Sequence, residues 1–72
     1  MKLYLIKKTT DLRGMKRIKY HTRFSSSDKP NWERAFTNLK DCQYKLDELM
    51  DADLDYTNWF KFTYEIIEKE VE

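Results

Sequence analysis

The chain has very few of the residues that break or cross-link secondary structure: one glycine, one proline and one cysteine among 72 residues. A single glycine, Gly14, is too few for a glycine-rich phosphate loop or for the tight turn that presents a catalytic serine. A single cysteine, Cys42, excludes an internal disulfide, so we expect a reducing, cytoplasmic setting. The longest apolar run covers only residues 3–6, and the sequence therefore predicts no membrane span.

Little in the sequence favours catalysis or metal binding. His21 and Cys42 are the only soft metal ligands and fall on different predicted elements, whereas a zinc site needs three or four ligands. Residues 51–62 begin with the aspartate spacing of a calcium-binding EF-hand loop but lack its glycine at position six and its glutamate at position twelve. We therefore predict a protein that is not an enzyme, with no catalytic residue, metal or cofactor.

What the chain does have is aromatic bulk and separated charge. It contains five Tyr, four Phe and two Trp, and each such side chain can bury about 150–250 Å². Residues 1–30 carry nine Lys and Arg against two Asp, whereas residues 31–72 carry five Lys and Arg against eleven Asp and Glu. This separation favours either an interaction surface of one sign or mutual neutralisation of the two halves within the fold.

Hydrophobic periodicity predicts four elements. Residues 2–9 and 15–25 are rich in β-formers and flank the turn-forming stretch "TDLRG", which indicates a β-hairpin. Residues 29–50 follow serine and aspartate capping residues and repeat apolar side chains at helical spacing. Residues 56–68 alternate at period two, which is typical of a third strand. The predicted apolar stripe of the helix consists of Trp32, Ala35, Phe36, Leu39, Cys42, Leu46, Leu49 and Met50.

The order of these elements predicts one small α+β domain over residues 1–72 with a two-layer ββαβ architecture. We expect a three-stranded antiparallel sheet in the spatial order 2-1-3, with the one helix packed on one face. An order 1-2-3, with one parallel pair, stays open. Because a single helix covers only one face of a sheet, we expect the other face to be exposed.

The candidate binding residues follow from this arrangement. From Arg17 onward, every second residue of "MKRIKYHTRF" is basic or titratable, and we expect these side chains on the helix-free face. Exposed aromatic and arginine side chains are typical of surfaces that bind other proteins. The predicted partner-binding residues are Arg17, Lys19, His21, Arg23, Trp59 and Lys61. A second, acidic docking surface is predicted from Asp47, Glu48, Asp51, Asp53 and Asp55, although a solvated helix end would have the same composition.

In layout the chain resembles the small proteins of bacteriophages and other mobile elements. The features that carry this resemblance are the immediate strand "MKLYLIKK", the single helix "NWERAFTNLKDCQYKLDELM" and the closing strand "WFKFTYEIIEKEVE". No specific family is identified and no motif matches, so no functional residue is carried over. The resemblance implies a protein that binds and modulates a host or defence protein, as anti-CRISPR proteins do.

We therefore expect a small non-enzymatic interaction protein, a monomer or a homodimer, that inhibits or modulates a host or defence protein. The alternative is a module for single-stranded nucleic acid, in which Arg17, Lys19 and Arg23 neutralise phosphates and Trp59 or Tyr4 stacks on bases. The sequence pI of about 7.8 is low for a dedicated nucleic-acid-binding protein, which favours a protein partner.

Overall fold

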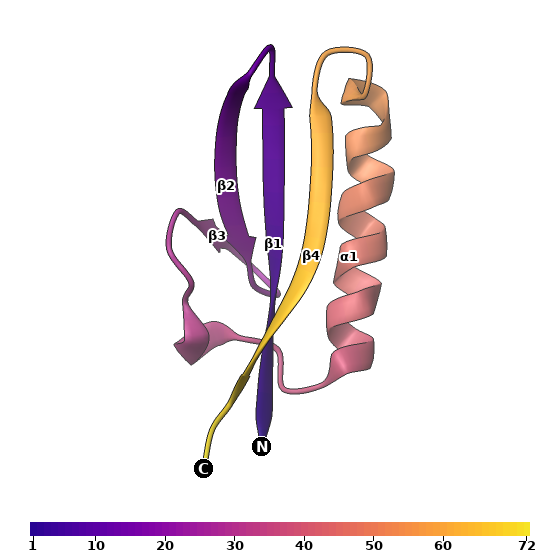
Figure 1. Ribbon diagram of the computed structural model, residues 1–72. Coiled ribbons are helices and arrows are strands. Elements are labelled where there is room, and N and C mark those ends of the chain that lie inside the picture. The colour runs from indigo at the N-terminus through magenta and orange to yellow at the C-terminus, as the bar shows by residue number, and fades with distance from the viewer.

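The computed structural model describes residues 1–72 and packs one helix on a four-stranded antiparallel sheet (Figure 1). The α+β fold with a single helix on an antiparallel sheet is thus confirmed. The strands are β1 (Lys2–Leu12), β2 (Met15–His21), β3 (Ser26–Ser27) and β4 (Lys61–Glu70), and the helix is α1 (Leu39–Asp53). Two short 3-10 turns, η1 (Trp32–Arg34) and η2 (Leu54–Tyr56), lie before and after the helix.

The sheet order is β3-β2-β1-β4, with the long β1 between β2 and β4. The prediction of three strands in the order 2-1-3 is therefore wrong in its strand count. The fourth strand is the short β3, whose Ser26 pairs with His21 after the chain turns back on itself. A two-residue strand made of serines has no period-two pattern, and for this reason the local sequence does not predict it.

The β1–β2 hairpin closes through a two-residue turn, so β1 is longer than predicted, whereas β2 ends at His21 and not at the predicted residue 25. Arg13 and Gly14 both have positive φ, 52° and 88°, as a type I′ turn requires. The Asp11 carboxylate accepts a hydrogen bond from the Gly14 N–H at 2.9 Å. This turn brings the strands together at once, so β1 continues to Leu12 instead of ending at residue 9.

The helix begins at Leu39, ten residues later than the predicted start at residue 29. The intervening chain is extended at Phe36, which exchanges two backbone hydrogen bonds with Tyr4 of β1, at 2.8 and 2.9 Å. A helical Phe36 could not make this bridge. The N-cap is instead Asn38, whose side chain accepts a hydrogen bond from the Lys40 N–H at 2.8 Å.

The helix also ends later than predicted, at Asp53 rather than residue 50, and passes directly into η2. Residues 56–60 then form a turn, in which the N–H groups of Trp59 and Phe60 donate to the Tyr56 carbonyl. Consequently β4 begins at Lys61 instead of residue 56. It extends to Glu70, beyond the predicted end at residue 68, because its last residues pair with the start of β1.

The main core lies between α1 and the half of the sheet formed by β1 and β4. It contains the buried side chains of Ile6, Phe36 and Cys42, against which Tyr4, Leu46, Leu49 and Ile66 pack. Leu39, part of the predicted buried stripe, is 41% exposed because it opens the helix. Burial raises the pKa of the Cys42 thiol to about 11, so the thiol stays protonated and acts as a small apolar group.

The face opposite α1 is covered at the end near the chain termini. Leu5 is completely buried there, and η1 contacts β1. The Lys69 ammonium, on the same face as Leu5, lies 5.7 Å from the centroid of the Trp32 ring. The expectation that the helix-free face is exposed over its whole length is therefore wrong, because the chain between β3 and α1 crosses part of it.

Candidate functional site

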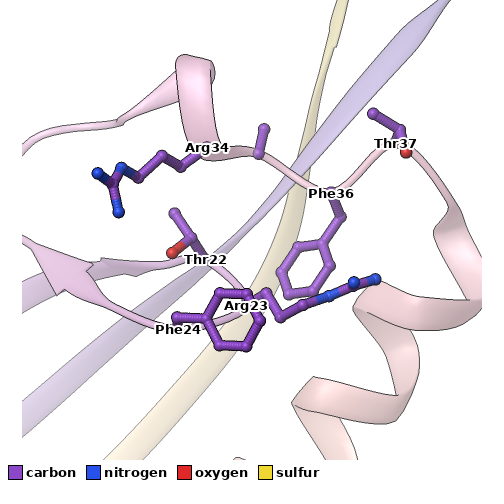
Figure 2. A pocket seen from close by; sticks show the side chains of 7 residues that line it. Thr22, Arg23, Phe24, Arg34, Phe36 and Thr37 are labelled. Carbon is purple, nitrogen blue, oxygen red and sulfur yellow. The ribbon is translucent and has the colours of Figure 1, made fainter.

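Two adjoining hollows lie between the β2–β3 connection and the first half of α1. Their volumes are about 320 and 350 Å³. Both are lined by Arg23, Phe24 and Phe36, so they form one continuous groove. The first hollow is completed by Thr22, Arg34, Ala35 and Thr37 (Figure 2), and the second by Asp41, Tyr44, Lys45 and Glu48.

A tight turn places Phe24 at the rim of this groove. The Thr22 N–H donates to the Ser25 carbonyl at 2.8 Å, and the Ser25 N–H donates to the Thr22 hydroxyl at 3.2 Å. Thr22 is buried, so the turn is anchored to the rest of the fold. Because these bonds close the turn on both sides, Arg23 and Phe24 project from its tip, and the Phe24 side chain is 88% exposed.

The floor of the groove is part of the buried core. Phe36 is held by its backbone bridge to Tyr4 and belongs to the buried core. In Figure 2 the Phe36 ring points toward the Arg23 side chain, beside which the Phe24 ring lies. The exposed Phe24 ring at the rim and the buried Phe36 ring at the floor thus line the same hollow, which suits the insertion of an apolar side chain between them.

The groove also carries one unpaired cation. Arg23 forms an ion pair with Asp41 of α1, with 2.9 Å between Nη2 and Oδ2, and Lys45 lies 3.8 Å from Glu48. Arg34 makes no ion pair within the chain. Its guanidinium is available to a carboxylate of a bound partner, in a bidentate arrangement that neither of the paired cations can offer.

The predicted basic residues of β2 lie on the face of the sheet that carries α1, and the prediction that they lie on the helix-free face is wrong. His21 is directly opposite Ile6 in the β1–β2 register, and Ile6 faces α1. Because side chains alternate along a strand, Lys19 and Arg17 share that face. The helix covers β1 and β4 but does not reach β2, so charged side chains are tolerated on its helix-side surface. The apolar Ile18 and the half-buried Tyr20 point to the opposite face instead.

His21 is half-buried beside several charged groups. Burial, followed by the positive charges of Lys8, Lys45 and Lys19, lowers its pKa below 6.5, and Asp53 opposes this effect. A lowered pKa means that the unfolded chain binds the proton more readily than the folded chain. The contribution of His21 to stability is therefore complete above pH 6.5 and is lost as the pH falls through the folded pKa.

We predict that the free energy of unfolding decreases between about pH 7.5 and about pH 5.5, and that His21→Gln removes most of this decrease. Urea unfolding followed by circular dichroism at several pH values in this window measures the effect. An equal pH dependence in the wild type and in His21→Gln would show that His21 is not its source.

The remaining predicted site residues are dispersed. Arg23 lines the groove, as described. Trp59 lies in the turn before β4 and is 71% exposed. Lys61 opens β4 opposite Asp11, on the sheet face away from α1. Arg17, Lys19, Trp59 and Lys61 therefore do not form one surface with Arg23. Lys19 is moreover paired with Asp28 at 2.7 Å.

The predicted acidic docking surface is only partly exposed. Asp47, Glu48 and Asp51 lie on the solvent side of α1, and Asp55 is exposed in η2. Asp53 does not belong with them, because its side chain is only 14% exposed. Its carboxylate lies 2.7 Å from the Lys8 ammonium.

Asp53 and Lys8 belong to a polar cluster under the end of α1. The Tyr64 hydroxyl also donates to the Asp53 carboxylate. The Lys8 ammonium lies 4.7 Å from the centroid of the Phe62 ring. Burial and the neighbouring Asp53 raise the pKa of Tyr64. Every member of this cluster has a partner within the chain, so we assign it a structural role.

Sequence reasoning missed most of the groove. The sequence pattern predicts Phe24 at a strand end, Phe36 in a buried helix stripe and Arg34 in the first turns of a helix that begins only at Leu39. The local signal for Phe24 was the polar stretch "HTRFSSSD", in which threonine and serines favour a turn over a strand. Nothing local indicates that residues 34–37 lie against this turn.

Comparison of the chain with protein-family models, curated proteins and solved structures gives no match. The expected role as a phage-type inhibitor therefore stays a prediction. None of the helices has the length and apolar character that crossing a membrane would need.

Proposed function

We propose that this protein binds another protein, and that it does so through the groove between the β2–β3 connection and α1. In this proposal an exposed segment of the partner inserts an apolar side chain between Phe24 and Phe36. A carboxylate beside that side chain binds the Arg34 guanidinium. The single observation that carries the proposal is the nearly full exposure of Phe24 at the rim of a preformed hollow.

The chemistry of the groove supports a protein partner over a small cofactor. Each hollow is at the lower end of the range for small-molecule pockets, about 300–1,000 Å³, and holds one or two side chains. Phenylalanine, tyrosine and arginine are residue types enriched in protein interfaces, and Tyr44 adds a second exposed aromatic at the helix side. Arg23 and Asp41 form an exposed rim pair that favours orientation more than affinity.

The proposal is tested by affinity capture from extracts of the native host, with Phe24→Ser as the test variant and Met15→Ser as its control. Met15 is exposed to a similar degree but lies at the far end of the β1–β2 hairpin. We expect a partner that the wild type and Met15→Ser both capture and that Phe24→Ser loses. With the purified partner, the affinity should fall at least tenfold in Phe24→Ser.

The same experiment separates the nucleic-acid alternative. That alternative is favoured by four cations of the β1–β2 hairpin that make no ion pair within the chain, Lys7, Arg13, Lys16 and Arg17. A captured protein that nuclease treatment releases, and that Phe24→Ser retains, would support binding through nucleic acid and contradict the groove proposal.

A further inference from the structure

The protein exposes more surface than a compact monomer of its mass. Its accessible surface is 5720 Å², whereas a folded monomer of 8.9 kDa exposes about 4,800 Å². Its radius of gyration is 12.5 Å, compared with about 11.2 Å for a compact domain of this length. The excess surface is close to the about 800 Å² that one partner contributes to a standard protein interface.

One part of this surface is the outer edge of β4. The strand runs over ten residues, Lys61–Glu70, and pairs only with β1. Its outer N–H and C=O groups have no partner strand. Natural edge strands are protected by shortening, proline, coverage or charged side chains. β4 is long and has no proline, and it carries charged residues such as Lys61 and Glu65. An antiparallel strand from another chain fits this edge.

The end of α1 and the chain that leads from it into β4 carry several exposed apolar side chains. Lys45 lies on the flank of α1 that faces β2, because it lines the groove and its charge lowers the pKa of His21. Leu49 lies on the side of α1 that packs against the core. Helical geometry then places Met50 and Leu54, one turn apart, on the β4-facing flank. Figure 1 shows α1 on the β4 side of the sheet and η2 at the end where β4 begins. The exposed fractions are 47% for Met50, 62% for Leu54, 54% for Tyr56 and 71% for Trp59.

We propose that a second copy of this chain covers this surface in a symmetric dimer, with β4 paired antiparallel to β4 of the second copy about a two-fold axis at Thr63. The two sheets then join into one. In this register Lys61 lies opposite Glu65 of the second copy, and Phe62 lies opposite Tyr64 of the second copy. Each of these contacts occurs twice, and the apolar end of α1 meets its symmetry mate.

The charges along β4 select this register. Lys61 and Glu65 share a sheet face, and neither forms an ion pair within its own chain. An axis at Glu65 would place two Glu65 side chains together and oppose Lys61 to Lys69, which repels. An axis at Ile67 would move the dimer contact away from Leu54. It would also pair Glu65 with Lys69 of the second copy, but the Lys69 ammonium already lies over the Trp32 ring of its own chain.

Light scattering coupled to size exclusion, with the full chain at high micromolar concentration, tests the proposal. The wild type should have twice the mass of 8.9 kDa. Lys61→Glu and Glu65→Lys each bring like charges together across the axis and should be monomeric. An equimolar mixture of these two variants should form a heterodimer, because each contact then joins opposite charges: Glu at 61 faces Lys at 65 in one contact, and the unchanged Glu65 faces the unchanged Lys61 in the other. The double variant should dimerise with itself for the same reason.

Circular dichroism should show that each variant is folded, because both positions are exposed and outside the core. Leu54→Asp is a second disrupting variant that leaves β4 unchanged, and it should also be monomeric. A monomeric wild type would overturn the proposal. So would a dimer that survives both single charge reversals, or single variants whose mixture stays monomeric, because either result places the contact in another register or on another surface.

Discussion

Replacing Ile6 by alanine is expected to lower the free energy of unfolding by about 4 kcal/mol. Ile6 is completely buried at the centre of the core, where it faces Phe36 and Cys42. The substitution removes three carbon atoms from a site enclosed by sheet and helix, and the surrounding side chains cannot all move to fill the cavity. A chain of this length is stabilised by only about 5 kcal/mol, so Ile6→Ala should keep only about 1 kcal/mol of stability, with roughly one chain in six unfolded near room temperature.

Urea unfolding followed by circular dichroism measures this loss, and Ile18→Ala is the matched control. Ile18 lies on the neighbouring strand β2 but is 40% exposed. Its replacement should cost less than about 1 kcal/mol. Equal losses in the two variants would mean that the helix does not pack on the Ile6 face of the sheet.

Replacing Asp53 by alanine is expected to lower the free energy of unfolding by about 3 kcal/mol. The substitution leaves the Lys8 ammonium, 16% exposed, without its carboxylate, and it leaves the Tyr64 hydroxyl without its acceptor. An isolated charge in a partly buried site costs more than the ion pair itself contributes. The last turn of α1 should loosen first, because Asp53 is its link to β1 and β4.

Asp51→Ala is the control for this prediction, since Asp51 lies on the same turn but is exposed and unpaired. Its effect should stay within about 0.5 kcal/mol. The double variant Lys8→Met with Asp53→Leu removes both charges together and should recover most of the loss. A double variant as unstable as Asp53→Ala would show that the unpaired Lys8 charge is not the cause.

The two proposed interfaces use opposite flanks of α1. The groove lies on the side of β2, and the proposed dimer contact lies on the side of β4. Both can therefore be occupied at once, and a dimer would present two grooves to its partners. Linked binding sites of this kind raise avidity when a partner itself offers two copies of the bound segment.

The acidic segment shows how far local pattern predicts a site. Asp51 and Asp55 lie in solvent, as a charged helix end implies, whereas Asp53, four positions after Leu49, falls on the buried side once the helix continues past residue 50. Asp53 turns inward because Lys8 of β1 lies beneath it, forty-five positions away in sequence. The same ion pair lies at the last residue of the helix, past its predicted end at residue 50.

The local sequence pattern predicts those features that depend on a single helix, strand or turn. The hairpin follows from its turn residues, the amphipathic helix from its 3.6-residue period, and the shared face of Phe62, Tyr64 and Ile66 from the alternation of β4. Tertiary contacts decided which face of β2 meets the helix and where the helix begins. These depend on the Ile6–His21 register and on the bridge from Phe36 to Tyr4. A strand can bury either face until its neighbours are in place, and a helix yields its first turns when the backbone gains hydrogen bonds elsewhere.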